Sequence, residues 1–259
     1  MKPTPLDRQE ALVLTANLLI SQLILLAIGV VASIVAAGIA SGDWGAAVLG
    51  FAWVGIIRQS LGALGALPTL AAGIGLAAAF TVAAFLAEKR ALSTEAGRQS
   101  VLKTRQGVNG ELARLPFPLV IALMALTGFT EELLFRFAVM GIVMQLLAPV
   151  LPGPVVAAIA LFVSSTVFWF SHVRYRDLTT TVLTLGLALV LGGAFLATGS
   201  LAVVAIAHAL YDIAVLAVAR IQMSRDPDYF GGPAPTRAML DQLEREETAT
   251  THEESSSDD

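Results

Sequence analysis

Three charged residues lie inside one long apolar stretch, residues 116–147, which is otherwise free of charge. They are Glu131, Glu132 and Arg136. One charged side chain at the centre of a bilayer costs about 3 kcal/mol on insertion scales, so three would cost about 9 kcal/mol. That is comparable to the net stability of a whole domain. Such groups are kept where they pair or face a polar cavity, so we interpret them as part of a functional site.

The spacing of these residues predicts two different roles for the two carboxylates. Glu132 and Arg136 are four apart, so they share a helix face and can form an ion pair. Glu131 lies about 100° further round the helix and can face a different cavity. It has no local partner in the sequence, so it is our candidate general base. A Glu132–Arg136 clamp that only holds helices together is the alternative interpretation of the pair.

Two later apolar stretches carry further polar residues that could do chemistry. His172 ends the aromatic stretch 168–171 and shares a helix face with Phe168. A histidine near a membrane boundary can also be simply interfacial. His208 and Asp212 are four apart, so one helix face presents both an imidazole and a carboxylate. They could hydrogen-bond to each other, bind a metal or polarise a carbonyl oxygen.

Two kinds of hydrolytic chemistry remain open for this set. His172, His208 and Asp212 could hold Zn²⁺ with one position open for water, so Zn²⁺ is a candidate cofactor. The sequence has no HExxH motif, so such a metal would need ligands from different helices. Without a metal, Glu131 and His172 would activate water, while His208 and Asp212 would stabilise the tetrahedral intermediate.

The composition indicates which elements must position these residues. The chain has 259 residues, of which 56% are hydrophobic and only 14% are charged, and its mean hydropathy is +0.76. These values are typical of a multi-pass membrane protein, because soluble domains carry about 25% charged residues. The absence of cysteine excludes disulfides and thiolate metal sites. We therefore predict an all-α membrane helix bundle with six to eight transmembrane helices in the cell membrane, and no nucleic-acid partner.

Six apolar runs predict clear crossings, and their links predict an orientation. The runs are residues 11–40, 60–87, 116–147, 153–171, 178–197 and 201–222, and a shorter apolar piece, 46–57, could be a further span or a re-entrant segment. The links 88–115 and 172–177 are basic, whereas the links around 149–154 and 198–200 carry no charge. Basic links are favoured on the cytoplasmic side, so we expect both termini in the cytoplasm.

The composition also predicts three regions along the chain. Residues 1–10 form a short cytoplasmic segment, and residues 11–222 form the transmembrane domain, with the motifs in 116–215. Residues 223–259 form an acidic cytoplasmic tail, predicted to be disordered because it combines low hydrophobicity with like charges.

The order of the three motifs resembles that of the CPBP intramembrane protease family, also called the Abi or CAAX-protease-like family. The resemblance covers residues 116–215. It rests on Glu131-Glu132-x-x-x-Arg136, then Phe168-x-x-x-His172, then His208-x-x-x-Asp212, each on an apolar helix. Its eukaryotic members, the type II CAAX prenyl endopeptidases, remove the last three residues from prenylated proteins. They have Asn at the last motif position, whereas this chain has Asp212, as some prokaryotic members do.

The resemblance implies an eight-helix intramembrane endopeptidase, a hydrolase whose active site opens toward the cytoplasm. It implies that Glu131 and His172 activate water, that His208 and Asp212 hold the oxyanion, and that the substrate is a membrane-associated or prenylated protein or peptide. One difficulty is depth: Glu131 lies about 22 Å along its helix from the cytoplasmic end, whereas His172 lies at the inner end of its own helix. Either the helices extend beyond the hydrocarbon, or a water-filled cavity reaches inward.

We therefore predict that the protein is an intramembrane endopeptidase of the glutamate or metalloprotease type, which acts near the cytoplasmic leaflet. Glu132 and Arg136 would orient the site. Two alternatives remain: a non-catalytic membrane scaffold or bacteriocin-immunity protein on the same fold, and a proton-coupled transporter, because intramembrane carboxylates and histidines also build proton relays.

Overall fold

The computed structural model describes residues 6–172, 178–226 and 229–230, and these residues form helices without any strand. This confirms the predicted all-α class. The elements, in chain order, are α1 (Arg8–Ser41), α2 (Trp44–Val48), α3 (Ala52–Leu61), α4 (Ala66–Ala91), α5 (Glu95–Gln106), α6 (Val108–Leu112), α7 (Phe117–Glu132), the π-helix η1 (Leu133–Val139), α8 (Met140–Leu147), α9 (Gly153–Ser171), α10 (Leu178–Thr198) and α11 (Leu201–Arg225).

Six helices in the described part of the chain are long and apolar enough to cross a membrane. They are α1, α4, the continuous run Phe117–Leu147, α9, α10 from Thr180 onward, and α11. They agree with the six predicted crossings. The region 46–57 adds none, because α2 and α3 have only five and ten residues. The eight crossings implied by the family resemblance are therefore not found among the described residues.

The ends of these helices follow from local sequence signals. At the start of α1, the Asp7 side chain accepts from the Glu10 N–H at 2.7 Å, and the Glu10 side chain accepts from the Asp7 N–H at 3.1 Å. This reciprocal cap satisfies donors that the first turn leaves unpaired. The same helix stops at Gly42, whose φ of 68° suits a residue without a side chain. Ser200 caps the start of α11 by accepting from the Val203 N–H.

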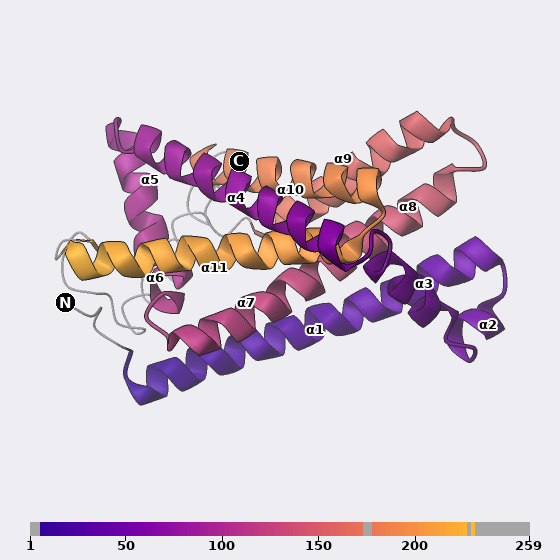
Figure 1. Cartoon of the computed structure of the whole chain (residues 1–259), viewed down its shortest axis with the longest axis horizontal. Helices are drawn as coiled ribbons and strands as arrows, with labels where there is room; N and C mark the ends of the chain where they lie inside the picture. The colour runs from indigo at the N-terminus through magenta and orange to yellow at the C-terminus, as the bar shows by residue number, and fades with distance from the viewer. Residues whose placement is uncertain (1–5, 173–177, 227–228, 231–259) are drawn as a thin grey trace, which may run out of the picture.

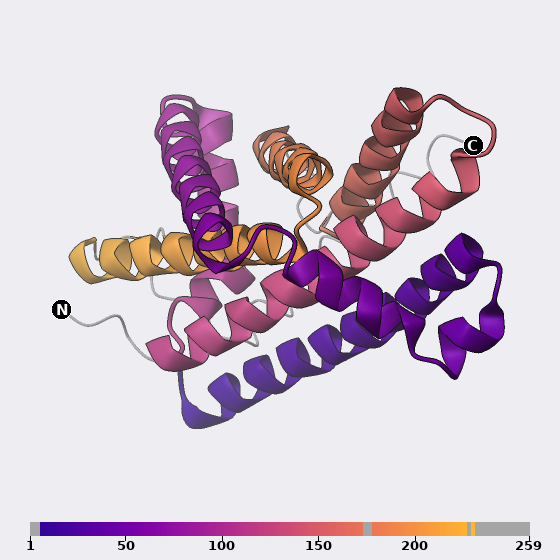
Figure 2. The ribbon, with the colours of Figure 1, turned by 45° about the vertical axis from the view of Figure 1, so that its right-hand side comes forward.

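The bundle has two ends, and each end carries different short elements and connections. Figures 1 and 2 show α7, η1 and α8 following one another in a continuous line, with α1 alongside them. α9 returns beside α8, and α11 packs against both α4 and α7. The helices α5 and α6 and the start of α7 lie at one end, whereas α2, α3 and the α8–α9 connection lie at the other (Figure 1).

Two glycines let α11 approach its neighbours closely. A Cβ on Gly128 of α7 would lie only 2.8 Å from the Ala209 backbone nitrogen of α11. A Cβ on Gly73 of α4 would lie 2.7 Å from the Ile206 side chain. Contacts this short require glycine, so these positions let the backbones meet. The middle of α11, where His208 lies, is thereby held against α7.

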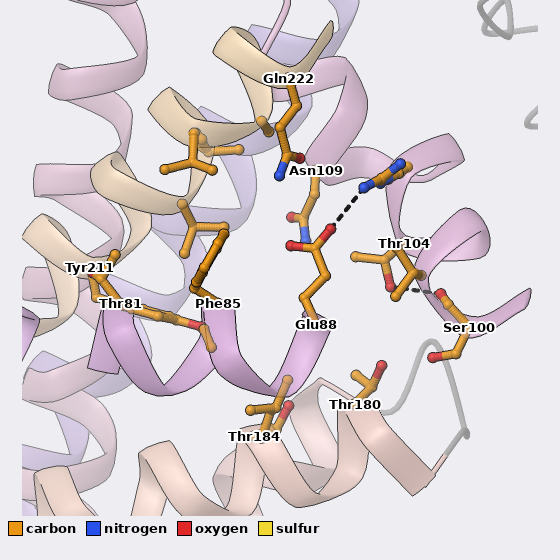
Figure 3. A pocket seen from close by; sticks show the side chains of 18 of the residues that line it. Thr81, Phe85, Glu88, Ser100, Thr104, Asn109, Thr180, Thr184, Tyr211 and Gln222 are labelled. Carbon is orange, nitrogen blue, oxygen red and sulfur yellow. Dashed lines mark hydrogen bonds and ion pairs between the residues drawn. The ribbon is translucent and has the colours of Figure 1, made fainter. Parts of the chain in front are cut away.

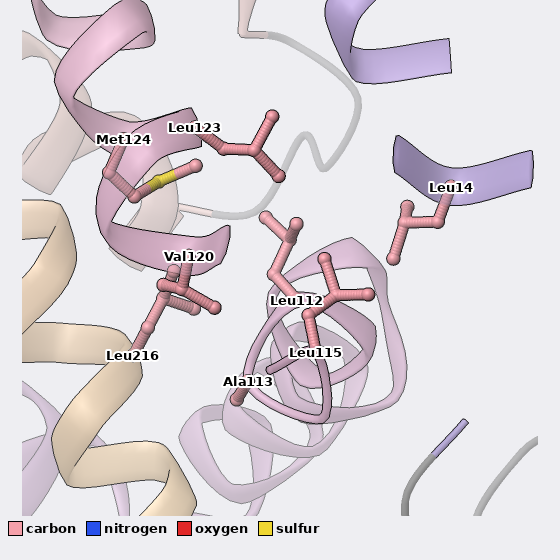
Figure 4. Close-up of a cluster of buried hydrophobic side chains, with 8 residues drawn as sticks. All are labelled: Leu14, Leu112, Ala113, Leu115, Val120, Leu123, Met124 and Leu216. Atoms are coloured by element: carbon pink, nitrogen blue, oxygen red, sulfur yellow. The ribbon is translucent and has the colours of Figure 1, made fainter. Parts of the chain in front are cut away.

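The basic stretch 88–115 is more ordered than the polar loop that we predicted. It contains α5 and α6, and the chain after α6 is anchored by Arg220 of α11, whose Nη1 donates to the carbonyls of Ala113 and Leu115 at 3.2 and 2.6 Å. A cluster of buried side chains fills the space beneath, contributed by α1, α6, α7 and α11 and the turn after α6 (Figure 4). Its members are Leu14, Leu112, Ala113, Leu115, Val120, Leu123, Met124 and Leu216.

Some predictions concern residues that the structure does not describe. Of the acidic tail predicted over 223–259, residues 227–228 and 231–259 are not described, whereas 223–225 continue α11 and do not belong to a disordered tail. Most of the basic link falls on 173–177, which are not described either. Half of the N-terminal segment, residues 1–5, lies outside the described residues as well.

Candidate active site

Glu132 is the centre of a buried charge network at the junction of α7 and η1. Glu132 and Arg136 are both fully buried, and Arg136 Nη1 donates to Glu132 Oε1 at 2.9 Å. The same carboxylate oxygen lies 2.7 Å from His208 Nδ1. Arg136 Nη2 also donates to the Ala188 carbonyl of α10 at 3.3 Å. The predicted Glu132–Arg136 ion pair is present, and it extends to α10 and α11.

Glu131 faces a different group, as its position on the helix predicted. Its Oε2 lies 3.5 Å from His172 Nε2 and 3.9 Å from His208 Nε2. This oxygen is buried and has no hydrogen-bond partner among the described residues. A buried carboxylate oxygen without a partner requires a water, a ligand or a function. Glu132 Oε2 and Arg136 Nε are also buried without a partner, but Glu131 Oε2 is the atom that lies near the Nε2 atoms of both histidines.

His172 reaches Glu131 because α9 ends partway along the α7–α8 run. α9 packs on α8, η1 and α10, and Ser164 Oγ donates to the Phe135 carbonyl of η1 at 2.8 Å. Two turns later, the end of α9 lies level with Glu131.

The run Phe117–Leu147 has 31 residues and is about 46 Å long, whereas a hydrocarbon core is about 30 Å thick. The run is therefore long enough for the first of the two explanations of the depth difference, helices that extend beyond the hydrocarbon.

Both histidine rings are oriented through Nδ1. His172 Nδ1 lies 2.8 Å from the Phe168 carbonyl, and a carbonyl oxygen only accepts, so this nitrogen carries the proton. His208 Nδ1 lies 2.7 Å from Glu132 Oε1. Each ring therefore presents Nε2 toward Glu131. Asp212 Oδ2 lies 3.6 Å from His208 Nε2, which is too far for a direct hydrogen bond, so the firm partner of His208 is Glu132.

Phe168 is a central residue of the site, and its role was not predicted. Its ring lies under the Arg136 guanidinium, 4.3 Å from Cζ, and stacks on the His172 ring with centroids 4.3 Å apart. The Phe135 ring meets it edge-on at 5.1 Å, and the His208 ring is 5.9 Å away. Phe168 thus holds the rings and the cation in place. The available sequence signal was its position four residues before His172.

Gln22 also supports the site, from α1. It is buried, and Thr130 Oγ1 donates to Gln22 Oε1. Thr130 directly precedes Glu131, so this hydrogen bond ties the end of α7 to α1. Sequence reasoning missed Gln22, although an amide inside an apolar span is the kind of residue that marks a functional or packing role.

Residues 113–214 match the sequence model of the family described as type II CAAX prenyl endopeptidase Rce1-like. These residues form an Rce1-like domain of the CPBP family. Comparison of the chain with curated proteins and with solved structures gave no match.

The Rce1-like domain contains every residue that we predicted for the site. All six lie within ion-pair or hydrogen-bond distance of another member of the set, and Asp212 joins it through His208, at 3.6 Å. The description of the family as endopeptidases implies a protein substrate. The arrangement suits peptide hydrolysis, because a water about 2.8 Å from the free Glu131 oxygen could also reach an imidazole Nε2.

The proposed metal ligands do not form a metal site in the described residues. No group of three or more His, Asp or Glu side chains there is arranged to hold a metal ion. His172, His208 and Asp212 therefore do not fit Zn²⁺ as a ligand set in this structure, and the mechanism that follows uses no metal.

Proposed function

We propose that this chain is an intramembrane endopeptidase that hydrolyses a peptide bond of a membrane-associated protein or peptide near the cytoplasmic leaflet. The observation that carries the proposal is the buried, unpartnered Oε2 of Glu131, which faces the Nε2 atoms of two oriented histidines. A carboxylate in this position can take a proton from water.

In the first step, Glu131 removes a proton from a water that His172 helps to hold through Nε2. The water oxygen forms a bond to the carbonyl carbon of the substrate, and the carbonyl oxygen becomes an oxyanion. His208, when it carries both ring protons, donates Nδ1–H to Glu132 and Nε2–H to that oxyanion. Asp212, when protonated, donates a second hydrogen bond. Such donors stabilise the charge that develops in the transition state.

In the second step, the carbon–nitrogen bond breaks, and Glu131 returns its proton to the leaving amine. The products are a new C-terminal carboxylate and a new N-terminal amine. Glu132 and Arg136 take no part in bond making, because both are fully buried and paired. Their role is to hold His208 at its position.

The test compares membranes from cells that make the wild type or the Glu131→Gln variant, by mass spectrometry of protein termini. We expect new C-termini with the wild type and none with Glu131→Gln, while the variant stays in the membrane at an unchanged amount. Glu95→Gln is the matched control, because Glu95 is exposed on α5 and pairs with Arg98 far from the site. Identical termini with wild type and Glu131→Gln would contradict the proposal and favour a scaffold or a transporter.

A further inference from the structure

A cavity of about 270 Å³ lies between α4, α5, α10 and α11 (Figure 3). Its walls are largely apolar, with Phe85 on α4, Leu183 on α10 and Val215 on α11 among the lining residues. None of the six predicted site residues lines it. The cavity is therefore a feature that the catalytic proposal leaves unexplained.

The cavity runs along α11 from Tyr211 toward the end of the bundle that carries α5 (Figure 1). Its lining residues on α11 include Tyr211, Val215, Val218 and Gln222, which recur every three or four residues and so share one helix face. Tyr211 directly precedes Asp212. From Tyr211 to Gln222 the helix rises about 16 Å, which is the length of about five extended residues.

Hydrogen-bonding groups line this cavity along its length. The side-chain amides of Asn109 and Gln222 face into it (Figure 3), and neither bonds to another described residue. The hydroxyls of Thr81 and Thr104 donate to carbonyls of their own helices, at 2.8 and 3.1 Å, so their oxygens remain able to accept. The cavity thus offers both donors and acceptors between its apolar walls.

The charges at the far end of the cavity neutralise one another. Arg105 Nη2 donates to Glu88 Oε1 at 2.8 Å, and the Arg105 guanidinium lies over the Tyr229 ring, 4.5 Å from its centroid. Burial raises the pKa of the Tyr229 phenol to about 12, although the nearby Arg105 charge opposes this shift, so the phenol stays neutral. The cavity therefore offers no uncompensated charge to a ligand.

We propose that this cavity is a substrate subsite, which holds a short, uncharged, extended segment of the peptide substrate beside the scissile bond. The segment would place apolar side chains against the walls and backbone amides against Asn109, Gln222 and the threonine oxygens. A hydrocarbon chain is the less suitable occupant, because it would leave these groups without partners. The inference rests on the proposed function, since it extends the same active site.

The test measures binding rather than cleavage, and it uses the full chain carrying Glu131→Gln in lipid nanodiscs. The probe is a fluorescent pentapeptide of alternating leucine and alanine with blocked ends, followed by fluorescence anisotropy. Ala84→Trp fills the cavity from α4 and should weaken binding at least tenfold. Val82→Trp is its matched control, because Val82 is exposed on the same helix and does not line the cavity, and it should leave affinity unchanged.

A second variant separates a peptide from a lipid chain. Gln222→Leu removes hydrogen bonds but keeps an apolar wall, so peptide affinity should fall about fivefold, as expected for one lost hydrogen bond of about 1 kcal/mol. The binding of a fluorescent fatty acid should not fall. The inference would be overturned if the peptide did not bind, or if it bound Ala84→Trp as tightly as the unsubstituted cavity. It would also be overturned if the fatty acid displaced the peptide and Gln222→Leu left peptide affinity unchanged. Because the test measures binding and not cleavage, the peptide-binding result can be interpreted even if the chain proves not to cleave peptides.

Discussion

Glu132 binds two partners at once, a guanidinium four residues away and an imidazole from another helix. Replacing it with Gln leaves the fully buried Arg136 without a counter-ion. Breaking a buried ion pair by removing one partner costs about 3–5 kcal/mol. We therefore expect Glu132→Gln to lower the melting temperature of the purified protein clearly, as measured by thermal unfolding in detergent.

Glu131→Gln is the natural comparison for that measurement. The Glu131 oxygen that faces the histidines has no hydrogen bond to lose, so this variant should melt close to the wild type while losing cleavage. Equal melting temperatures for wild type and Glu132→Gln would contradict the structural role that we assign to Glu132.

Phe168 positions charged and reacting groups without itself reacting. Phe168→Leu keeps an apolar side chain but removes the flat ring that contacts the Arg136 guanidinium and the His172 ring. We expect cleavage to slow at least tenfold, because a misplaced catalytic group costs rate steeply, while the protein stays folded. Phe170→Leu should cleave at the wild-type rate, since Phe170 is two-thirds exposed on the outer face of α9. Similar rates for both variants would argue against a positioning role.

At the scale of elements, the approach of α11 to α7 brings His208 to the carboxylates. Gly128→Ala would place a methyl group 2.8 Å from the Ala209 nitrogen, so the two helices must separate. We expect a loss of about 1–3 kcal/mol, as for other overpacked sites, together with slower cleavage as the His208–Glu132 contact lengthens. Cleavage rate and thermal unfolding are measured on the same preparation.

Gly75→Ala is the control for this helix contact. A Cβ on Gly75 meets nothing within 4 Å, so the variant should be neutral or more stable by about 0.5–1 kcal/mol, because alanine is favoured in helices. If both glycine variants behave alike, close packing at Gly128 does not set the position of His208.

At the scale of the whole molecule, the two ends of the bundle should face opposite sides of the membrane. The chain has no cysteine, so single cysteines report accessibility directly. Ser93→Cys, in the exposed turn between α4 and α5, should react with an impermeant maleimide only after cells are opened. Leu49→Cys, exposed between α2 and α3, should react on intact cells. The reverse pattern would place the α5 end outside and contradict a cytoplasmic active site.

The sequence by itself determined the features that depend on neighbouring residues. Span length and hydropathy are local properties, and six crossings follow from them. The Glu132–Arg136 pair is local too, because residues four apart share a helix face, and here they meet even across the start of a π-helix. The order of the three motifs was likewise enough to indicate the family.

Only the tertiary structure decided which groups meet across helices. His208 pairs with Glu132, 76 positions away, rather than with Asp212 on its own face, and Thr130 pairs with Gln22, 108 positions away. These contacts depend on the depth and rotation of each helix, which are set where backbones pack at Gly128 and where α9 ends against η1. Hydropathy and helical periodicity describe one helix at a time, so they cannot specify either quantity.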